Sequence, residues 1–159
     1  MKNMELTKQH VLDFLKTQKL MAVATYGDFP WIASVYYTFD NDLNLYFLSS
    51  PSTLHCKFIQ QNSQVAVSIV DSAQSIAKPK KGLQVWGIAE QISDAAKIMH
   101  ALKMWKDFLG VIDQELTYKN MVTKVVSGRM YRITPKRIKL FDQELFKDVE
   151  DGEEPILEL

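Results

Sequence analysis

Short stretches of apolar and β-branched residues, separated by turn-forming residues, dominate the first half of the chain. These stretches predict four strands, at residues 20–25, 31–39, 43–48 and 64–70. Gly27, Asp28 and Pro30 supply turn chemistry between the first two, and the polar residues 40–42 separate the second from the third. The pattern therefore predicts that the first three strands form an antiparallel meander.

Longer strands follow in the second half of the chain. Residues 82–92 predict a fifth strand, in which Gly87 indicates a bend or bulge. Two further short strands are predicted at residues 130–134 and 137–141, separated by a proline and a lysine. Six or seven antiparallel strands with helices between them predict an α+β protein built round a small barrel.

Helical periodicity marks three more stretches. A first helix is predicted after Thr7, a candidate N-cap, because apolar positions recur at helical spacing behind it. A second is predicted from about residue 51 to residue 61, and a third from about residue 94 to residue 109. The segment 110–128 is compatible with a further short helix or with a loop.

The charge of the chain is balanced, with 19 lysines and arginines against 19 aspartates and glutamates. No overall field therefore attracts the protein to nucleic acid or to a membrane surface. No apolar run reaches the ~18 residues of a membrane span, and the N-terminus lacks the apolar core of a signal peptide. The single cysteine, Cys56, and three widely separated histidines argue against a disulfide and a metal site. We expect a cytoplasmic protein without a metal.

Nothing in the composition divides the chain into two folding units. Its length of 159 residues fits one domain with a core of ordinary size. The last stretch is strongly acidic, and we interpret residues 148–159 as a solvated acidic tail that follows a domain spanning residues 1–147.

The stretch LSSPSTLHCKF, residues 48–58, joins the third predicted strand to the second predicted helix, and we call it the corner. Ser50 is placed to cap this helix, with Pro51 at its first position. The N–H groups of Ser52 and Thr53 would then point outward at the positive end of the helix dipole. This arrangement suits an anion such as phosphate, although serine and threonine also cap helices without any ligand.

The order of these elements resembles the pyridoxamine-phosphate-oxidase-like family, whose members are FMN-binding split β-barrels. The resemblance covers residues 12–94, through the meander, the corner, the sequence NSQVAVSI and the long strand GLQVWGIAEQI. MYRITPKRIKLFD, near the end, is similar to the family's closing strands. The likeness is greatest to a small bacterial branch, in which the corner carries a threonine, a variable residue and a histidine, here Thr53, Leu54 and His55.

The resemblance implies an FMN site built from three segments. Backbone groups of the second strand would meet the flavin ring, and the candidate residues there are Ala33, Ser34, Val35, Tyr36, Tyr37 and Thr38. The corner would hold the FMN phosphate, with the candidates Leu48, Ser49, Ser50, Thr53, His55 and Lys57. The fifth strand would approach the ring through Gly82, Leu83 and Gln84. Members of the family are homodimers with the flavin at the subunit interface, so we expect a homodimer.

The sequence departs from the fuller oxidases of the family at positions that carry charge. They have an arginine early in the second strand, where this chain has Ala33, and an arginine–lysine pair at the corner, where it has Leu54 and His55. Lys57 and the lysines of KPKK, residues 78–81, are candidates to replace this charge. The C-terminal arginine–histidine signature that holds pyridoxal phosphate is also absent, so we do not expect a true pyridoxamine-phosphate oxidase.

Other residues admit a functional and a structural interpretation. Trp31, Trp86 and Trp105 are able to stack on a flavin, but such residues are more often found in a core or a dimer interface. Cys56 is a candidate redox thiol, although a small buried hydrophobe is its more usual role. The lysines of residues 78–81 suit a loop that closes over an anion, and equally a solvated loop.

The favoured function is that of an FMN-dependent oxidoreductase, with a nicotinamide as candidate electron donor. The flavin carries the redox chemistry in such a protein, which explains why the sequence shows no catalytic acid–base set. One alternative is a protein that stores or sequesters a flavin, or another planar ligand such as haem, without turnover. Another is an interaction module that has lost its cofactor.

Overall fold

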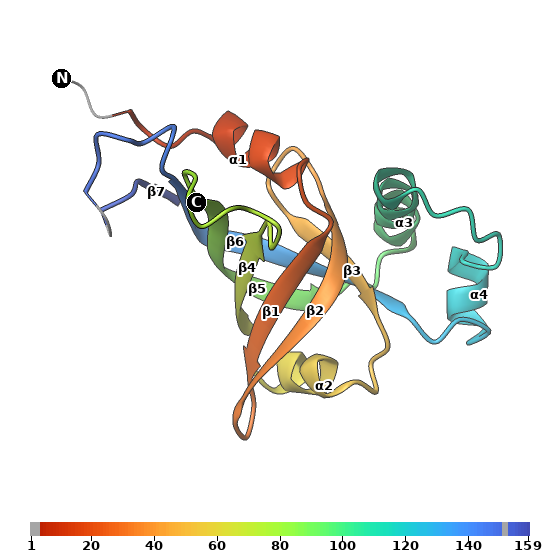
Figure 1. The fold of residues 1–159 in the computed structure, drawn as a ribbon. Coiled ribbons are helices and arrows are strands. Elements are labelled where there is room, and N and C mark those ends of the chain that lie inside the picture. The colour runs from red at the N-terminus through yellow and green to blue at the C-terminus, as the bar shows by residue number, and fades with distance from the viewer. Residues whose placement is uncertain (1–3, 151–152) are drawn as a thin grey trace.

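The chain forms a twisted antiparallel barrel with helices at both ends and along one side (Figure 1). The structure is a computed structural model that describes residues 4–150 and 153–159. Its strands are β1 (Leu20–Tyr26), β2 (Pro30–Phe39), β3 (Leu45–Ser49), β4 (Gln64–Val70), β5 (Lys81–Gln91), β6 (Arg129–Asp142) and β7 (Ile156–Glu158). Its helices are α1 (Lys8–Leu15), α2 (Leu54–Gln61), α3 (Ala95–Leu109) and α4 (Tyr118–Val122).

The third strand closes the barrel because it pairs on both sides. The sheet order is β3-β2-β1-β4-β5-β6-β7, and a further pairing of β3 with β6 joins β3 to the far side. β3 contacts β2 only along Tyr37–Phe39, whereas it contacts β6 along its whole length. Residues 30–36 of β2 have β1 on one side and none of the described strands on the other, and we call this the free edge of β2. The predicted α+β split barrel is confirmed.

The closing strand β6 is one element and not two. Two short strands were expected on either side of Pro135, but β6 runs without interruption from Arg129 to Asp142. Its register against β5 shifts between Trp86 and Gly87, because Gly87 lies opposite Pro135 while Trp86 lies opposite Arg137. The bulge expected at Gly87 is therefore confirmed, and it absorbs the proline without ending the strand.

The acidic end of the chain, predicted to be a solvated tail, lies along the edge of the sheet at residues 156–158. They form β7 and pair antiparallel with β6. Two ion pairs hold the segment, Arg137 Nε to Glu158 Oε1 at 2.7 Å and Lys139 Nζ to Glu154 Oε2 at 2.9 Å. The sequence pattern missed this strand because three residues are too few to show a period.

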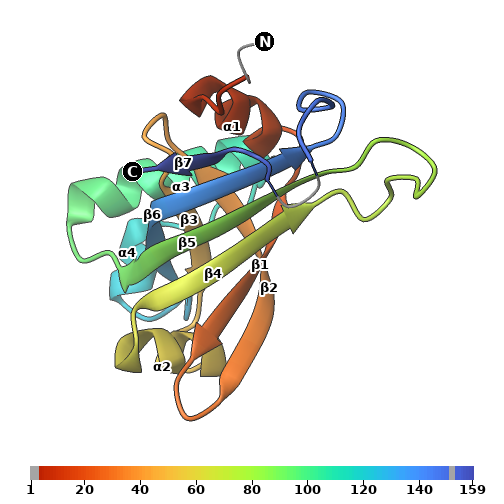
Figure 2. The ribbon, with the colours of Figure 1, turned by 90° about the vertical axis from the view of Figure 1, so that its left-hand side faces the viewer.

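The helices occupy both ends of the barrel and one flank (Figures 1 and 2). α1 and α2 lie at opposite ends, and α3 and α4 lie beside β3. Residues 110–128, for which a short helix or a loop was expected, contain one short helix, α4. Figure 2 also shows the loop between β4 and β5 projecting beyond the sheet. The corner between β3 and α2 thus lies at the end of the barrel that α2 covers.

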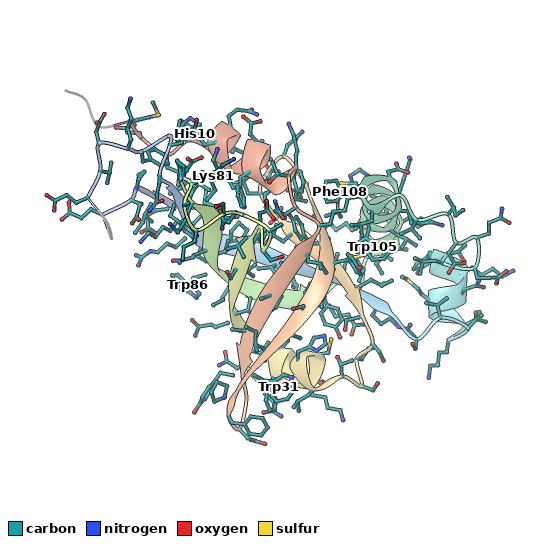
Figure 3. All side chains as sticks on the ribbon, in the orientation of Figure 1. His10, Trp31, Lys81, Trp86, Trp105 and Phe108 are labelled. Carbon is teal, nitrogen blue, oxygen red and sulfur yellow. The ribbon has the colours of Figure 1, made fainter. Side chains whose placement is uncertain are left out.

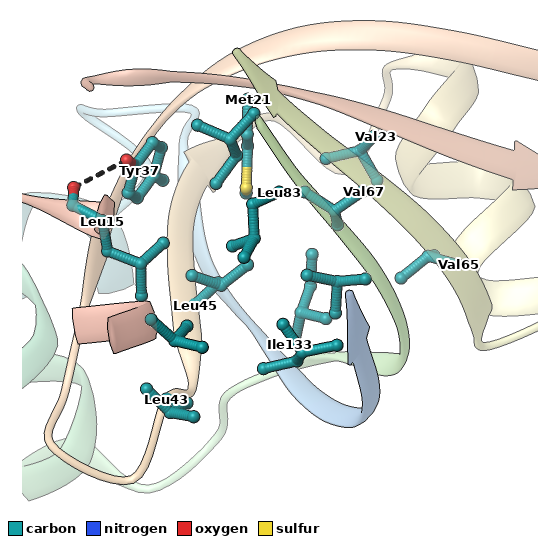
Figure 4. Packing of buried hydrophobic residues seen from close by; sticks show 14 of the residues in the cluster. Leu15, Met21, Val23, Tyr37, Leu43, Leu45, Val65, Val67, Leu83 and Ile133 are labelled. Atoms are coloured by element: carbon teal, nitrogen blue, oxygen red, sulfur yellow. Dashed lines mark hydrogen bonds between the residues drawn. The ribbon is translucent and has the colours of Figure 1, made fainter. Parts of the chain in front are cut away.

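Inward-facing side chains of the barrel strands form the main core (Figure 4). Phe47 is fully buried there and stacks on Tyr131, with ring centroids 5.1 Å apart and planes 14° from parallel. The hydroxyl of Tyr37, also buried, donates a 2.8 Å hydrogen bond to the carbonyl of Leu15 and ties β2 to the end of α1. A second cluster, which includes Tyr46 and Met130, packs beneath α3 and α4.

Substituting Phe47 with alanine tests the barrel closure. We expect Phe47→Ala to lower the free energy of unfolding by about 3–5 kcal/mol, because it leaves a cavity between β3 and β6. Denaturant titration followed by circular dichroism measures the effect. Ile112→Ala, at a side chain that is 92% exposed, serves as control and should change stability by less than about 0.5 kcal/mol. Equal effects of the two substitutions would contradict the packing described.

Candidate functional site

The chain turns at the corner before α2 begins. The predicted helix start, with Ser50 as N-cap and Pro51 at the first position, is wrong, because Thr53 is the N-cap and α2 begins at Leu54. The N–H and the hydroxyl of Thr53 both donate to the carbonyl of Ser50, at 3.0 and 2.7 Å. Serine followed by proline suits the start of a β-turn as well as that of a helix. No side chain caps α2, so the N–H groups of its first turn stay available.

Three side chains converge in front of this helix start. Nε2 of His55 lies 2.7 Å from Ser49 Oγ and 3.3 Å from Thr53 Oγ1. The hydroxyl hydrogen of Thr53 goes to the carbonyl of Ser50, so Thr53 Oγ1 faces His55 as an acceptor. In the shorter contact, between Ser49 Oγ and His55 Nε2, the tautomer of the ring decides which of the two atoms donates. The corner thus offers hydroxyl and amide donors together.

The thiol of Cys56 lies behind this cluster, so the expectation that it is buried is confirmed. Burial by itself raises the pKa of the Cys56 thiol. Hydrogen bonds to the thiolate outweigh burial and lower the pKa from 9.0 to about 7. They involve the side chains of His55, Thr53, Tyr131 and Ser49. The polar side chains of the corner therefore favour the thiolate form of Cys56 over the thiol.

The free edge of β2 provides unpaired backbone groups. The N–H of Tyr37 donates to the carbonyl of Lys19, on the β1 side. Because backbone groups alternate sides along an antiparallel strand, those of Ser34 and Tyr36 point to the free edge. Nε1 of Trp105, on α3, donates to the carbonyl of Tyr36 at 3.4 Å. The accessible part of the free edge of β2 therefore ends at Tyr36. A planar ligand lying along this edge would find both donors and acceptors.

The structure brings together only some of the predicted site residues. Ser49, Ser50, Thr53 and His55 form one hydrogen-bonded group. The other corner residues lie apart from it: Leu48 packs against the second cluster and Lys57 is exposed on α2. On β2, the side chain of Val35 packs on the core, while those of Ser34 and Tyr36 are exposed. Gln84 is also exposed, on β5.

Gln84 and Ser34 lie on the outer face of the sheet, which consists of the side chains that point away from the core. Gln84 pairs with Ser68, Ser68 with Ala22, and Ala22 with Ser34. Three strand spacings, roughly 14 Å, therefore separate Gln84 from Ser34. Of the other fifth-strand candidates, Leu83 is buried in the core and the outer side of Gly82 is covered by the ring of Phe141. The fifth-strand candidates at residues 82–84 therefore lie away from the corner, whereas the other end of β5, at Ala89–Gln91, lines a pocket together with Pro51 and Cys56.

The middle of the outer face is hollow and apolar. Small side chains on β1 and β4 floor a depression of about 490 Å³, which Gln84 and Trp86 flank. Large apolar side chains lie exposed around it, with Ile32 at 63%, Ile156 at 49% and Trp86 at 44% exposure. A surface of this kind on a monomer marks an interaction site.

The tryptophans and the loop lysines do not gather at the corner (Figure 3). Trp31 packs edge-on against Phe29 at the α2 end of the barrel, and Trp86 bonds to Gln64 on the outer face. In the loop, Lys80 donates to the carbonyl of Ile76, and Lys81 forms ion pairs with Asp142 and Glu144. Lys78 is exposed. Lys78 and Lys80 lie on the β4–β5 loop and Lys81 begins β5, and this loop projects away from α2 (Figure 2).

The described residues contain neither a metal-binding cluster nor a membrane-spanning helix. No group of three or more histidine, cysteine, aspartate or glutamate side chains is arranged to hold a metal ion. Among the helices at residues 4–150 and 153–159, none has the length and hydrophobicity needed to cross a bilayer.

The fold is that of a split β-barrel, with the hydroxyl and imidazole side chains of the corner gathered at one end. Residues 7–140 match the sequence model described as pyridoxamine 5'-phosphate oxidase. The chain belongs to this family. It is 32% identical over 123 residues to the UPF0306 protein PM1958 of Pasteurella multocida (strain Pm70), an alignment that covers 72% of this chain and 82% of the relative.

Solved structures with the same fold differ in the ligand that their names state. A heme binding protein from Mycobacterium smegmatis aligns with a TM-score of 0.71 and 14% identity, over 98% of this chain and 59% of that one. An FAD-binding protein from Mesorhizobium loti aligns with a TM-score of 0.64 and 18% identity, over 84% of this chain and 90% of that one. At these identities the likeness shows the fold alone.

The lowered pKa of Cys56 gives a direct test of the corner's geometry. Cys56 is the single cysteine of the chain, so the thiolate absorbance at 240 nm reports it alone. We expect a transition with a midpoint at about pH 7, absent in Cys56→Ser. In His55→Gln the midpoint should rise, because one donor to the thiolate is replaced. A wild-type midpoint at or above pH 9 would show that the donors do not converge on the sulfur.

Proposed function

We propose that the protein is an FMN-binding flavoprotein that acts as a homodimer and as an FMN-dependent oxidoreductase. The observation that carries the proposal is the meeting of Ser49, Thr53 and His55 at the uncapped start of α2. A phosphate group needs several donors that converge from one side, and these residues supply them. The free edge of β2 begins at the same end of the barrel.

The residues present fit FMN at both of its ends. The hydroxyl of Ser49 and the first-turn N–H groups of α2 would hold the phosphate. The backbone of Ser34 and Tyr36 would bond to the polar edge of the flavin ring. When bound, the flavin supplies hydride or electron transfer, and the protein has to bind it, orient it and limit the access of water. This division of labour requires no catalytic acid–base pair from the chain.

A second candidate function is storage or sequestration of a flavin or haem without turnover. The likeness to the heme binding protein of Mycobacterium smegmatis supports considering haem. The contacts of His55 favour the flavin, because Nε2 would have to give up Ser49 and Thr53 to bind iron. The absorbance spectrum of the purified protein separates the ligands. Anaerobic bleaching by NADH or NADPH, followed by reoxidation with an acceptor, separates an enzyme from a store.

The proposed homodimer would use the outer face. Its exposed apolar residues surround a floor of small side chains, Ala22, Ala24 and Ala66. Such a surface lets two copies approach closely about a twofold axis. Gln84 lies on the same face, so in a dimer it would be able to approach the flavin of the partner subunit. The family resemblance places Gln84 near the flavin, yet within one chain Gln84 lies far from Ser34 and the corner. A dimer of this kind would resolve the difference, because Gln84 would approach the flavin of the other subunit.

Adding charge at the corner tests the position of the phosphate. We expect Thr53→Glu to weaken FMN binding by at least about 100-fold, because a carboxylate would lie beside the phosphate. Quenching of flavin fluorescence on titration measures the affinity. Thr7→Glu makes the same change at the N-cap of α1, at the other end of the barrel, and should leave binding unchanged. Undiminished binding by Thr53→Glu would exclude the corner as the phosphate site.

Charge on the outer face tests the dimer. We expect Ala66→Arg to convert a dimer to a monomer in sedimentation velocity, because a long cation would be forced into the apolar floor. Affinity for FMN should fall by roughly 10-fold or more if the partner contributes to the site. Ala96→Arg, exposed on α3, is the control and should remain dimeric. A wild-type protein that sediments as a monomer would refute the assembly.

A further inference from the structure

We infer that Arg129 is the residue that pairs with the anionic end of the ligand at the corner and selects a phosphate-bearing flavin over an uncharged one. The inference deepens the proposed function and rests on it for the identity of the ligand. Leu54 and His55 stand where the family has its arginine–lysine pair, so we looked for a fixed positive charge that another part of the chain brings to the corner. Arg129 lies more than 70 residues away in sequence.

The register of β3 against β6 places Arg129 at the corner. Ser49 and Arg129 are direct partners in the antiparallel pair. Partners in such a pair project to the same side with Cβ atoms about 5 Å apart. The side is fixed two residues away, where Phe47 and Tyr131 stack in the core. Arg129 therefore shares a face with Ser49, whose hydroxyl contacts His55.

Arg129 differs from the other two arginines of the chain because it forms no ion pair with a carboxylate at residues 4–150 or 153–159. Arg132 forms an ion pair with Glu90, and Arg137 forms one with Glu158. Nη1 of Arg129 instead donates to the carbonyls of Val126 and Gly128 at 2.9 and 2.8 Å, with a weaker contact to Ser127. Among the described residues, no hydrogen bond uses its Nε or Nη2. The loop thus orients a guanidinium group whose charge is not neutralised.

The charge of Arg129 acts on the hydroxyl of Tyr131, a neighbour of Cys56. Burial and the neighbouring Cys56 raise the pKa of Tyr131, while the charge of Arg129 acts in the opposite direction. Lys57 is a weaker candidate, because its side chain is exposed on α2 and a flexible, hydrated ammonium group fixes an anion less well. Arg132 projects from the other face of β6. Of the three arginines, Arg129 alone lies on the face of β6 that it shares with Ser49.

The ligand selected by this arrangement carries a terminal phosphate. A guanidinium group binds a phosphate through two parallel hydrogen bonds, and Nε and Nη2 form such a pair. Riboflavin offers the same ring to the free edge of β2 but no anion to Arg129. Preference for FMN over riboflavin is therefore the measurable consequence of the inference.

The first experiment titrates FMN and riboflavin into the wild-type protein, Arg129→Gln and Arg132→Gln. We expect Arg129→Gln to weaken FMN binding about 10- to 100-fold and to leave riboflavin binding unchanged. Arg132→Gln, on the same strand but the opposite face, should bind both flavins as the wild type does. Equal FMN affinity in Arg129→Gln and the wild type overturns the inference and leaves the proposed function intact.

A second experiment needs neither flavin nor substitution. The chain has three arginines, so its side-chain Nε–H region of the ¹⁵N spectrum holds three signals, and Arg132 and Arg137 act as internal references. Inorganic phosphate added to the wild-type protein should shift the signal of Arg129 alone. If it does so while FMN fails to bind, the proposed function falls and the anion site stands. If phosphate shifts none of the signals, or all three equally, the inference is wrong even where Arg129→Gln fails to fold.

Discussion

The pairing of β3 with β6 is the constraint on which the rest of the structure depends. It stacks Phe47 on Tyr131 inside the barrel and so joins the two ends of the sheet through the core. A twisted strand cannot follow two neighbours along its full length when those neighbours diverge. β3 therefore leaves β2 after Tyr37 and continues along β6 to Ser49. The free edge of β2 and the position of the corner both follow from this departure of β3 from β2.

Most elements of the fold could be predicted from the sequence because their signals are local. The strands of the meander, the helix start at Asp94 and the bulge at Gly87 each depend on residues that are neighbours in the chain. The errors occur where a local signal has two meanings. Ser50 and Pro51 suit a turn as well as a helix start. Pro135 would usually end a strand, but the bulge beside it leaves Lys136 unpaired with β5 and lets β6 continue. Only the tertiary pairing decides between them.

The residues of the candidate site also differ in whether local sequence or tertiary pairing determines their position. Ser49, Thr53 and His55 are close in sequence, so their meeting at one turn was predictable. Arg129 was not, because its position depends on a register between strands about 80 residues apart, and one residue of slip would turn its side chain to the opposite face. For Gln84 the sequence assigned a site residue that the single chain places elsewhere. The family resemblance assigns it to the site, yet the single chain holds it on the outer face.

The donors that would bind an anion at the corner are largely those that stabilise the thiolate of Cys56. Ser49, Thr53 and His55 all lower the pKa of this thiol. A phosphate held by the same groups would compete for their hydrogen bonds and add a negative charge nearby, and both effects raise the thiol pKa. Ionisation of Cys56 would therefore weaken anion binding at the corner, and a bound anion would oppose ionisation of Cys56. Cys56 therefore belongs among the groups that would set the charge of the proposed anion site, although it lies on the buried face of α2.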